Sequence, residues 1–377
     1  MSSQYPAVDP EGLLEYSVVF TDRALNHMSR EFQGVMRDVS ATLKKVYHAD
    51  AVALVPGGGS VGMEAVARQL ATGQKCLVLR NGWFSYRWTQ IFDMGSIPSS
   101  SIVLKARPDD TASAAAWSPA PLEEVVATIR AERPALVFAP HVETASGILL
   151  PDDYLRSVAD AVHDVGGLFV LDCVASGTVW VDMEACGVDI LISAPQKGWS
   201  STPGVALIML STAGRERVEA TISTSFAIDL KKWLQIMQTY ENGGHAYHAT
   251  MPTGVLAQLR DTMKEMEGIG YPALKLRQME LGRRVRDLFA QRGLKSVAAR
   301  GYGAPGVVVY HTQDIDLHNA RKFIAAGLQT ASGVPLMCDE PADFRTFRVG
   351  LFGLDKLTHI DQTVRNLELA LDKVLVP

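Results

Sequence analysis

Seven short apolar segments, separated by amphipathic stretches, constrain the fold of this chain more than any other feature of its sequence. They lack the alternation of polar and apolar residues that marks a strand with one solvent-exposed face. The segments are Ala51–Val55, Lys75–Leu79, Ser101–Leu104, Ala135–Ala139, Leu168–Asp172, Val188–Ser193 and Gly204–Leu210. Such runs are typical of strands buried on both faces of a mostly parallel sheet. Because helical patterns such as Leu122–Glu132 alternate with them, the chain is expected to build βαβ units. We therefore predict an α/β fold with a mostly parallel seven-stranded sheet flanked by helices.

The pattern changes after Pro252, where long helices with charged faces replace this alternation. Helices are predicted at 254–267, 273–291, 317–329 and 360–373, and strands at 296–299, 306–310 and 346–350. This part of the sequence indicates a smaller C-terminal α+β domain. We accordingly expect an N-terminal arm over 1–22, a large domain over 23–255, and a linker helix with the small domain over 256–377.

Composition and charge exclude several classes of protein. The 41 acidic residues outnumber the 36 basic ones, so the chain lacks the excess of positive charge that nucleic-acid binding needs. No apolar run approaches the roughly 20 residues that span a bilayer, and no signal peptide is evident at the N-terminus. The four cysteines are scattered, without the paired spacing of a zinc site or a disulfide framework. We expect a cytoplasmic enzyme with neither a nucleic-acid nor a membrane partner.

A glycine-rich loop, Pro56–Gly62, follows the first predicted strand and opens a helix. Glycines let the backbone approach a ligand closely, and the N-terminus of a helix offers free N–H groups to an anion. We therefore expect this loop to bind a phosphate, although a tight turn without a ligand fits the same residues. The loop also satisfies the GxGxxG pattern of dinucleotide sites, but Arg80 follows the next strand where an acidic residue is usual. An arginine there suits a 2′-phosphate, so an NADP site stays open.

Two residues at strand ends bear on this choice. Asp172 ends a buried strand, and the carboxyl ends of parallel strands point into the ligand crevice of an open sheet. Lys197 follows another buried strand and precedes a glycine turn. A lysine amine in a desolvated site, or near a cationic cofactor, becomes a nucleophile that forms Schiff bases. A phosphate loop, a carboxylate and a lysine together suit pyridoxal phosphate, whereas a dehydrogenase needs neither Asp172 nor Lys197 in this arrangement.

At these residues the chain resembles the class V aminotransferases of pyridoxal-phosphate fold type I, most closely the alanine/serine–glyoxylate aminotransferase group. The resemblance runs from about Leu25 to the C-terminus. Its most specific part extends from the strand end LDCVAS, at 171–176, through Gln196 and Lys197 to Pro203 and Gly204. The resemblance implies that Lys197 forms the Schiff base and carries the proton, and that Asp172 pairs with the pyridinium N–H.

The same resemblance implies further cofactor contacts. Val174 and Phe84 would pack on opposite faces of the ring, and Thr144 would bind the ring hydroxyl. Phe84 belongs to the segment NGWFSYR, residues 81–87, which is similar to a family motif. Gly58, Gly59 and Ser60 would supply N–H and hydroxyl donors to the phosphate, and Gln196 would reach the phosphate beside the lysine.

The resemblance also implies a shared active site and a substrate anchor. Tyr247 and Thr250 match residues that reach the phosphate of the neighbouring subunit, which implies a homodimer. Arg348 matches the arginine that binds the substrate carboxylate, and its planar fork suits bidentate binding. Residues 16–23 depart from the family because they contain neither Gly nor Pro where a glycine- and proline-rich loop is usual. We therefore expect the substrate side of the pocket to differ.

The sequence thus predicts a homodimeric aminotransferase that moves an amino group from a small amino acid to a 2-oxo acid by a ping-pong mechanism. Glyoxylate or pyruvate as acceptor is implied by the resemblance alone. The alternatives within the same cofactor class are a lyase, a racemase or a cysteine desulfurase, for which Cys338 is the candidate nucleophile. An NADP-dependent dehydrogenase is the alternative from another class. No metal is expected, because His245 and His248 have no evident third ligand.

Overall fold

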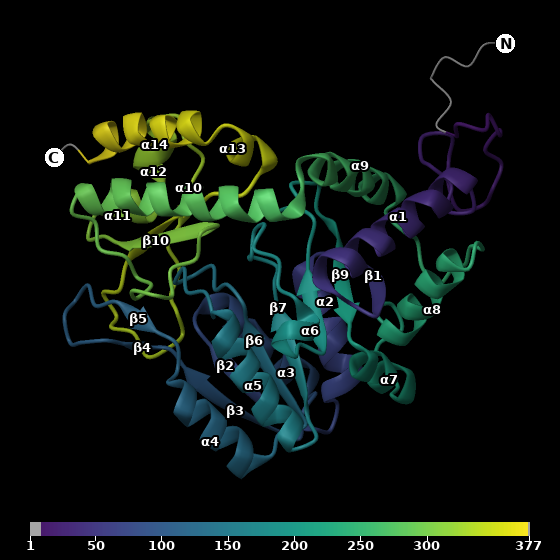
Figure 1. Ribbon diagram of the computed structural model, residues 1–377, viewed down its shortest axis with the longest axis horizontal. Coiled ribbons are helices and arrows are strands. Elements are labelled where there is room, and N and C mark those ends of the chain that lie inside the picture. The colour runs from purple at the N-terminus through teal and green to yellow at the C-terminus, as the bar shows by residue number, and fades with distance from the viewer. Residues whose placement is uncertain (1–8, 376–377) are drawn as a thin grey trace.

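A seven-stranded sheet lies at the centre of the larger domain (Figure 1). In the computed structural model, which describes residues 9–375, its strands are β1 (Ala51–Gly57), β2 (Lys75–Arg80), β3 (Ser100–Lys105), β6 (Leu136–Pro140), β7 (Leu168–Asp172), β8 (Ile190–Ser193) and β9 (Gly204–Leu210). They are adjacent in the order β1-β9-β8-β7-β6-β2-β3. All seven predicted strands therefore belong to one sheet, and the predicted fold class is confirmed.

The direction and burial of these strands explain both the sequence pattern and the place of the site. β6, β7 and β8 are buried at every position, which is why their sequences show no polar alternation. β9 runs antiparallel to both of its neighbours, and the other pairs are parallel. The carboxyl ends of the six remaining strands therefore meet at one edge of the sheet, where open α/β sheets bind their ligands.

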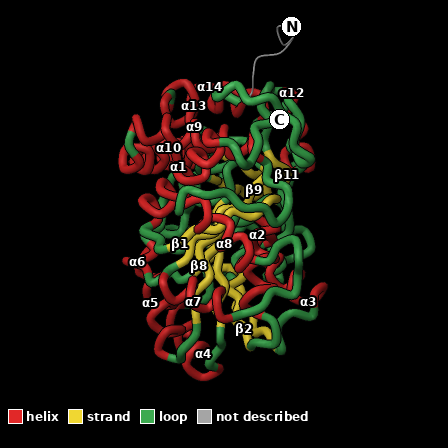
Figure 2. The backbone as a smooth tube through the Cα atoms, turned by 90° about the vertical axis from the view of Figure 1, so that its right-hand side faces the viewer, coloured by secondary structure: helices red, strands yellow, loops and turns green. Residues whose placement is uncertain are grey.

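Helices cover both faces of the sheet (Figure 2). On one face α2 (Gly59–Val66), which continues as a π-helical turn over Ala67–Ala71, packs beside α3 (Trp83–Gly95). The other face carries α4 (Leu122–Glu132), α5 (Asp152–Asp164) and α6 (Met183–Cys186), and the β1–β9 end carries α1 (Arg30–Tyr47), α7 (Thr212–Ala220) and α8 (Leu230–Glu241). Within residues 9–375, no helix combines the length and apolar character that crossing a membrane requires.

The C-terminal part of the chain forms a second, smaller sheet beside the first (Figure 1). Two helices, α9 (Thr253–Ile269) and α10 (Tyr271–Gln291), lead to it. Its strands β10 (Val307–His311), β12 (Thr346–Gly350) and β11 (Ala331–Ser332) are adjacent in that order, and both pairs are antiparallel. α13 (Leu354–Thr358) and α14 (Ile360–Val374) pack against α10. The predicted small C-terminal α+β domain is confirmed.

Two predicted elements of this domain are wrong. The helix expected over 317–329 is divided into α11 (Ile315–His318) and α12 (Arg321–Ala325), because Ala320 adopts a left-handed conformation with φ 65°. Gly327, with φ 90°, follows the end of α12. The strand expected at 296–299 makes only isolated bridges, one of them to Trp117 in the short β5 (Trp117–Ser118), which pairs with β4 (Arg107–Pro108). Residues 1–8 of the predicted N-terminal arm lie outside the described residues.

A second apolar cluster joins the two sheets. It combines Val142 and Ala145, which follow β6, with Val307 and Val309 of the small sheet and Leu336 from a C-terminal loop, all of them buried. The cluster packs β10, which pairs with β12, against the loop that follows β6. The C-terminal domain thereby borders the site, where Arg348 lies near Phe84 and Phe352 lies near Lys197.

Candidate active site

A pocket of about 500 Å³, part of it open to solvent, lies where the strand ends meet. Its lining includes eight of the predicted site residues: Gly59, Ser60, Phe84, Thr144, Asp172, Val174, Gln196 and Lys197. They follow β1, β2, β6, β7 and β8, so five strand ends contribute to one cavity. The rest of the described lining is Met63, Arg87, Val142 and Ala175, none of which was predicted to belong to the site.

Asp172 is the acid at the base of this pocket. It is buried at the end of β7, where its Oδ1 accepts a hydrogen bond from the Val174 N–H at 2.9 Å. Burial raises the pKa of Asp172 to about 6, although the Val174 N–H and the charge of Lys197 act in the opposite direction. A cationic N–H donor in the pocket would restore the ordinary acidity of this carboxyl group.

Lys197 lies in the turn after β8 and is half-buried. Its Nζ lies 5.8 Å from the centroid of the Phe84 ring and 5.7 Å from that of Phe352. Burial lowers the pKa of the Lys197 amine, and the charge of Arg348 lowers it further, while Asp172 raises it. The surroundings therefore favour a neutral amine, which is the nucleophilic form.

Phe84 is held in the pocket by the N-terminus of α3. The carboxylate of Glu143, which has no exposed surface, accepts hydrogen bonds from Phe84 N at 3.2 Å, Ser85 N at 2.9 Å, Ser85 Oγ at 2.6 Å and Ala145 N at 2.9 Å. Gly82 allows this approach, since a Cβ atom there would lie 2.7 Å from Glu143 Cγ. Glu143 thus ties the loop after β6 to the helix that carries the aromatic ring.

The glycine loop brings the N-terminus of α2 to the other end of the pocket. Gly57 has φ 129°, a conformation that favours glycine, and a Cβ at Gly59 would lie 2.6 Å from Val174 Cγ2. Gly58 is the N-cap residue, and no described side chain caps the helix. Val61 N donates to Gly58 O at 2.9 Å, so the N–H groups of Gly59 and Ser60 are the ones that face an anion at this helix end. Ser60 Oγ accepts a hydrogen bond from Arg87 Nη1 at 2.9 Å.

Arg348 reaches the site from the small domain. It lies in the middle strand, β12, where its Nε donates to the carbonyl oxygen of Ser332 at 2.8 Å. The guanidinium carbon lies 5.5 Å from the centroid of the Phe84 ring, and the side chain is largely buried. Burial lowers the pKa of Arg348, yet a guanidinium keeps its charge in proteins. Its remaining donors therefore offer a cation to an anionic group above the ring.

Tyr247 and Thr250 are not brought into the pocket of their own chain. They lie between α8 and α9, where Tyr247 Oη is 3.1 Å from Thr250 Oγ1 and about half of the Tyr247 surface is exposed. The Tyr247 ring lies 5.5 Å from that of His27, near the N-terminal segment. Residues 16–23 are likewise absent from the described lining of the pocket. The predicted role of Tyr247 and Thr250 toward a neighbouring subunit stays a prediction.

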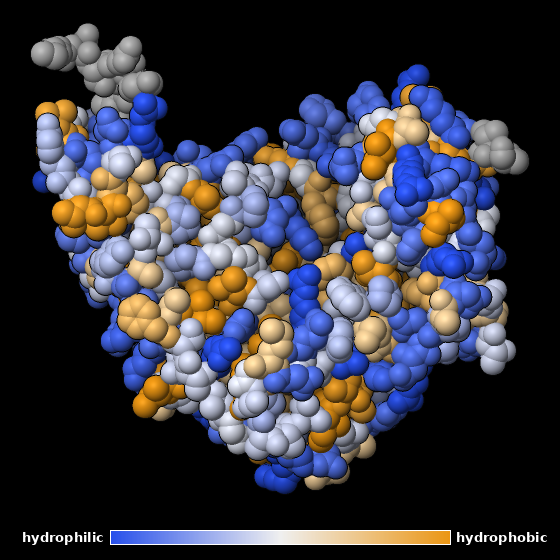
Figure 3. Space-filling view, turned by 180° about the vertical axis from the view of Figure 1, so that it is seen from behind, coloured by the Kyte–Doolittle hydropathy of each residue, from blue (hydrophilic) through white to orange (hydrophobic). Residues whose placement is uncertain are grey.

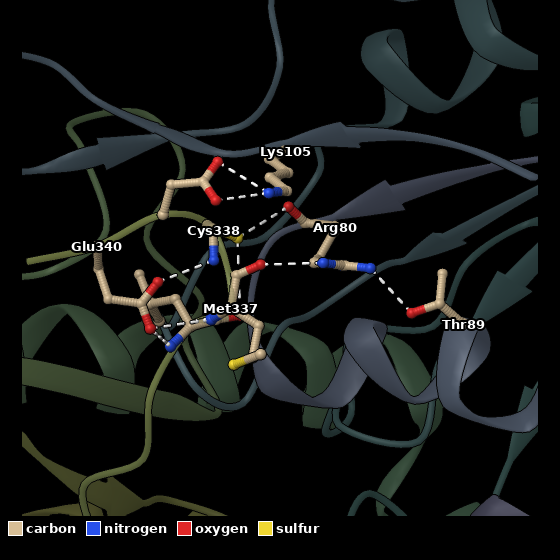
Figure 4. A network of polar contacts seen from close by, with 8 residues as sticks. Arg80, Thr89, Lys105, Met337, Cys338 and Glu340 are labelled. Carbon is tan, nitrogen blue, oxygen red and sulfur yellow. Dashed lines mark hydrogen bonds and ion pairs between the residues drawn. The ribbon is translucent and has the colours of Figure 1, made fainter. Parts of the chain in front are cut away.

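Arg80 and Cys338, the residues on which the dehydrogenase and desulfurase alternatives depend, bond to other parts of the protein (Figure 4). Arg80 donates to Met337 O at 3.1 Å and to Thr89 Oγ1 at 2.8 Å, so its guanidinium is committed within the protein. Cys338 is buried with its Sγ 3.4 Å from Arg80 O, and burial raises the pKa of this thiol to about 12. Glu340 accepts three backbone N–H groups of the same loop. These contacts argue against a 2′-phosphate site at Arg80 and against Cys338 as a desulfurase nucleophile.

Arg87 and Glu143 are the polar residues at this site that sequence reasoning left without a role. Arg87 is part of the segment at 81–87 and lies one helical turn after Phe84, which is a signal that it shares the pocket-facing side of α3. Glu143 immediately precedes Thr144, but its partners Phe84 and Ser85 lie 59 and 58 residues away in the sequence. Only the folded chain reveals that contact.

The sequence of this chain is similar to those of several known proteins. A family profile described as "Aminotransferase class-V" matches residues 13–334. A soluble hydrogenase small subunit of a Synechococcus species is 24% identical over 80% of this chain and 75% of that protein. The L-aspartate–glyoxylate aminotransferase of Paracoccus denitrificans is 28% identical over 73% and 67% of the two chains. The 2-aminoethylphosphonate–pyruvate transaminase 2 of Paraburkholderia xenovorans is 29% identical over 88% and 84%.

Solved structures share the fold as well. The crystal structure of an alanine–glyoxylate aminotransferase from a Nostoc species superimposes with a TM-score of 0.77 at 21% identity. The matched region covers 92% of this chain and 89% of that one, so it includes both the large sheet and the small C-terminal domain.

Proposed function

The chain belongs to the class-V aminotransferase family, and we propose from this premise that it moves an amino group from a small amino acid to glyoxylate or pyruvate. It is a pyridoxal-phosphate-dependent aminotransferase of fold type I. The observation that carries the proposal is the convergence of Lys197, Asp172 and Phe84 on one pocket at the carboxyl edge of the sheet.

The residues in the pocket fit the cofactor. Asp172 is a buried carboxylate with one backbone donor, so it lacks a partner that a pyridinium N–H would supply. The Phe84 ring and the Val174 side chain line the same cavity, and the uncapped N-terminus of α2 suits a phosphate. When bound, pyridoxal phosphate supplies an aldehyde for the lysine and a ring that withdraws electrons from the substrate.

Each proposed residue then has a distinct task. Lys197, as a neutral amine, would take the proton from the α-carbon of the substrate. It would then deliver this proton to the aldehyde carbon of the cofactor, C4′. Asp172 accepts the pyridinium hydrogen bond and keeps that nitrogen protonated. Arg348 binds the substrate carboxylate, and Phe84 orients the reacting group by stacking. Thr144 and Gln196 are proposed to hold the ring hydroxyl and the phosphate.

The acceptor is inferred from two sources. Relatives named above use glyoxylate or pyruvate according to their names, and both acceptors are small 2-oxo acids with one carboxylate. Arg348 provides one cation for such a group beside the ring. A ping-pong reaction follows, because the donor must leave as a keto acid before the acceptor occupies the same carboxylate site.

Homodimerisation would complete the site. Leu13, Leu14, Val18 and Phe226 are large apolar side chains with mostly exposed surfaces, in the N-terminal segment and before α8. Figure 3 shows apolar side chains gathered on the surface near the N-terminal end of the described chain. A second copy packed there would cover them and bring Tyr247 and Thr250 toward the partner's phosphate. Light scattering should give twice the mass of one chain, and an active monomer would contradict the shared site.

We also propose that the enzyme works in the cytoplasm. All four cysteines are free and buried. A reducing compartment keeps them so. Recovery of the full chain from an oxidising compartment, with these thiols paired, would contradict this location.

Steady-state kinetics test the proposed reaction. Alanine, serine and aspartate are paired in turn with glyoxylate, pyruvate and 2-oxoglutarate. We expect parallel double-reciprocal lines and the highest kcat/KM with glyoxylate or pyruvate. In Arg348→Gln, KM should rise at least tenfold for donor and acceptor alike, because both lose the guanidinium. Turnover confined to 2-oxoglutarate would refute the acceptor class.

A further inference from the structure

The phosphate end of the pocket contains one cation that the proposed set of residues does not use. Arg87 lies on α3 one turn after Phe84, and its guanidinium carbon is 4.7 Å from the centroid of the Phe84 ring. Its Nη1 donates to Ser60 Oγ at 2.9 Å, and both residues line the pocket. Ser60 is the second residue of α2, so the guanidinium lies directly at the helix N-terminus that is proposed to bind phosphate.

The charges at this end are otherwise unbalanced. The residues proposed for the phosphate are Gly58, Gly59, Ser60, Gln196, Tyr247 and Thr250, and all of them are neutral. A phosphate ester carries a charge of about −1.5 to −2 at neutral pH. Neutral N–H and O–H donors alone leave that charge uncompensated in a partly desolvated pocket. A cation beside the helix N-terminus would compensate this charge, and Lys197 is already committed to the aldehyde.

Arg87 is available for this task. Among the described residues it forms no ion pair with a carboxylate, and the Ser60 hydroxyl is its hydrogen-bond partner. Its charge also reaches the catalytic pair, since it acts to lower the pKa of both Asp172 and Lys197. Arg348, by contrast, is bonded to the Ser332 carbonyl on the substrate side.

We propose that Arg87 is the cation that binds the phosphate group of the cofactor. The guanidinium donates to phosphate oxygens, and Ser60 Oγ, released from Arg87, donates its own proton to the same group. Arg87 stays stacked on Phe84, so one α3 turn holds both the ring and the phosphate. This inference rests on the proposed cofactor site, because it assigns a ligand within that site.

Comparison of two forms of the cofactor tests the assignment. The cofactor-free wild type, Arg87→Met and Arg87→Lys are titrated with pyridoxal phosphate and with pyridoxal, which lacks the phosphate, while tryptophan fluorescence is followed. We expect Arg87→Met to weaken pyridoxal phosphate at least tenfold and pyridoxal less than twofold. Arg87→Lys should lie between, because it keeps the charge but loses the fork. Arg130→Met is the matched control, since Arg130 is exposed and pairs with Asp164, and it should change neither affinity.

Any other pattern of affinities overturns the assignment of Arg87 to the phosphate. Equal losses for both ligands would assign Arg87 to the ring or to the fold and overturn the proposal. Unchanged affinity for pyridoxal phosphate, with a raised KM for aspartate but not for alanine, would move Arg87 to the substrate side and overturn it as well. If Arg87→Met does not fold, the ratio of the two affinities in Arg87→Lys decides. Failure of the wild type to bind pyridoxal phosphate would instead refute the cofactor site itself.

Discussion

Asp172 and Lys197 show how one pocket sets opposite demands on two ionisable groups. Burial raises the pKa of the acid and lowers that of the amine, so desolvation penalises the charged form of each group before a ligand binds. A bound cation relieves the acid, and reaction with an aldehyde uses the neutral amine. A ligand that carries both a cationic N–H and an aldehyde therefore relieves the desolvation cost of both groups, and this relief adds to its affinity.

A pH-dependent cost in stability follows for Asp172. Folding raises its pKa from 3.8 to about 6. The stability that the protonated carboxyl group allows is therefore fully present below pH 3.8, and it is lost as the pH rises through 6 and the buried group ionises. We expect cofactor-free Asp172→Asn to be more stable than the wild type at pH 7.5, by about 3 kcal/mol for a shift of roughly two units. The gap should narrow toward pH 4.5, as followed by chemical denaturation.

The control for this measurement is Asp110→Asn, because Asp110 lies in an exposed loop. Its stability difference from the wild type should be small, because the side chain is exposed. An Asp172→Asn protein that is less stable than the wild type by the same amount at every pH would contradict the raised pKa.

At the scale of elements, the first turn of α3 depends on a carboxylate from the loop that follows β6. Glu143 accepts four hydrogen bonds there, three of them from α3 residues. We expect Glu143→Gln to lower the free energy of unfolding by about 2–4 kcal/mol, since the amide turns an N–H₂ group toward N–H donors. Ser85→Ala removes one of the four donors and also the Oγ atom that accepts from Asn81 N and Gly82 N, and it should cost about 1–2 kcal/mol. Denaturant titration of both variants checks the order, and equal costs below 0.5 kcal/mol would refute it.

The elements differ in how far they could be predicted. Strands such as β7 are buried on both faces, so their residues form apolar runs whose ends carry Asp172 and Lys197 in a readable position. The helix expected at 317–329 failed because nothing in the sequence marks Ala320 as left-handed. The roles of Arg87 and Glu143 were not predicted for another reason. Their hydrogen-bond partners Ser60 and Ser85 lie 27 and 58 residues away along the chain. The division of the chain at 22 and 255 stays a prediction.

At the scale of the whole molecule, the site is built from two sheets and needs both. The large sheet supplies the acid, the amine and the helix N-terminus, while β12 of the small sheet supplies Arg348. The apolar cluster around Leu336 joins them, so movement of one domain against the other would change the distance between Arg348 and Lys197. The proposed second subunit would close the remaining side.

The central claim is that Lys197 transfers the proton in an amino-group exchange. The direct test is the visible absorption of the holoenzyme after a small amino acid is added without any keto acid. In the wild type the yellow colour should bleach within the time of one turnover and return when glyoxylate or pyruvate is added. Lys197→Ala, with cofactor bound, should show no bleaching on that time scale. Bleaching of the variant at the wild-type rate, or a wild type that no amino acid bleaches, would contradict the account.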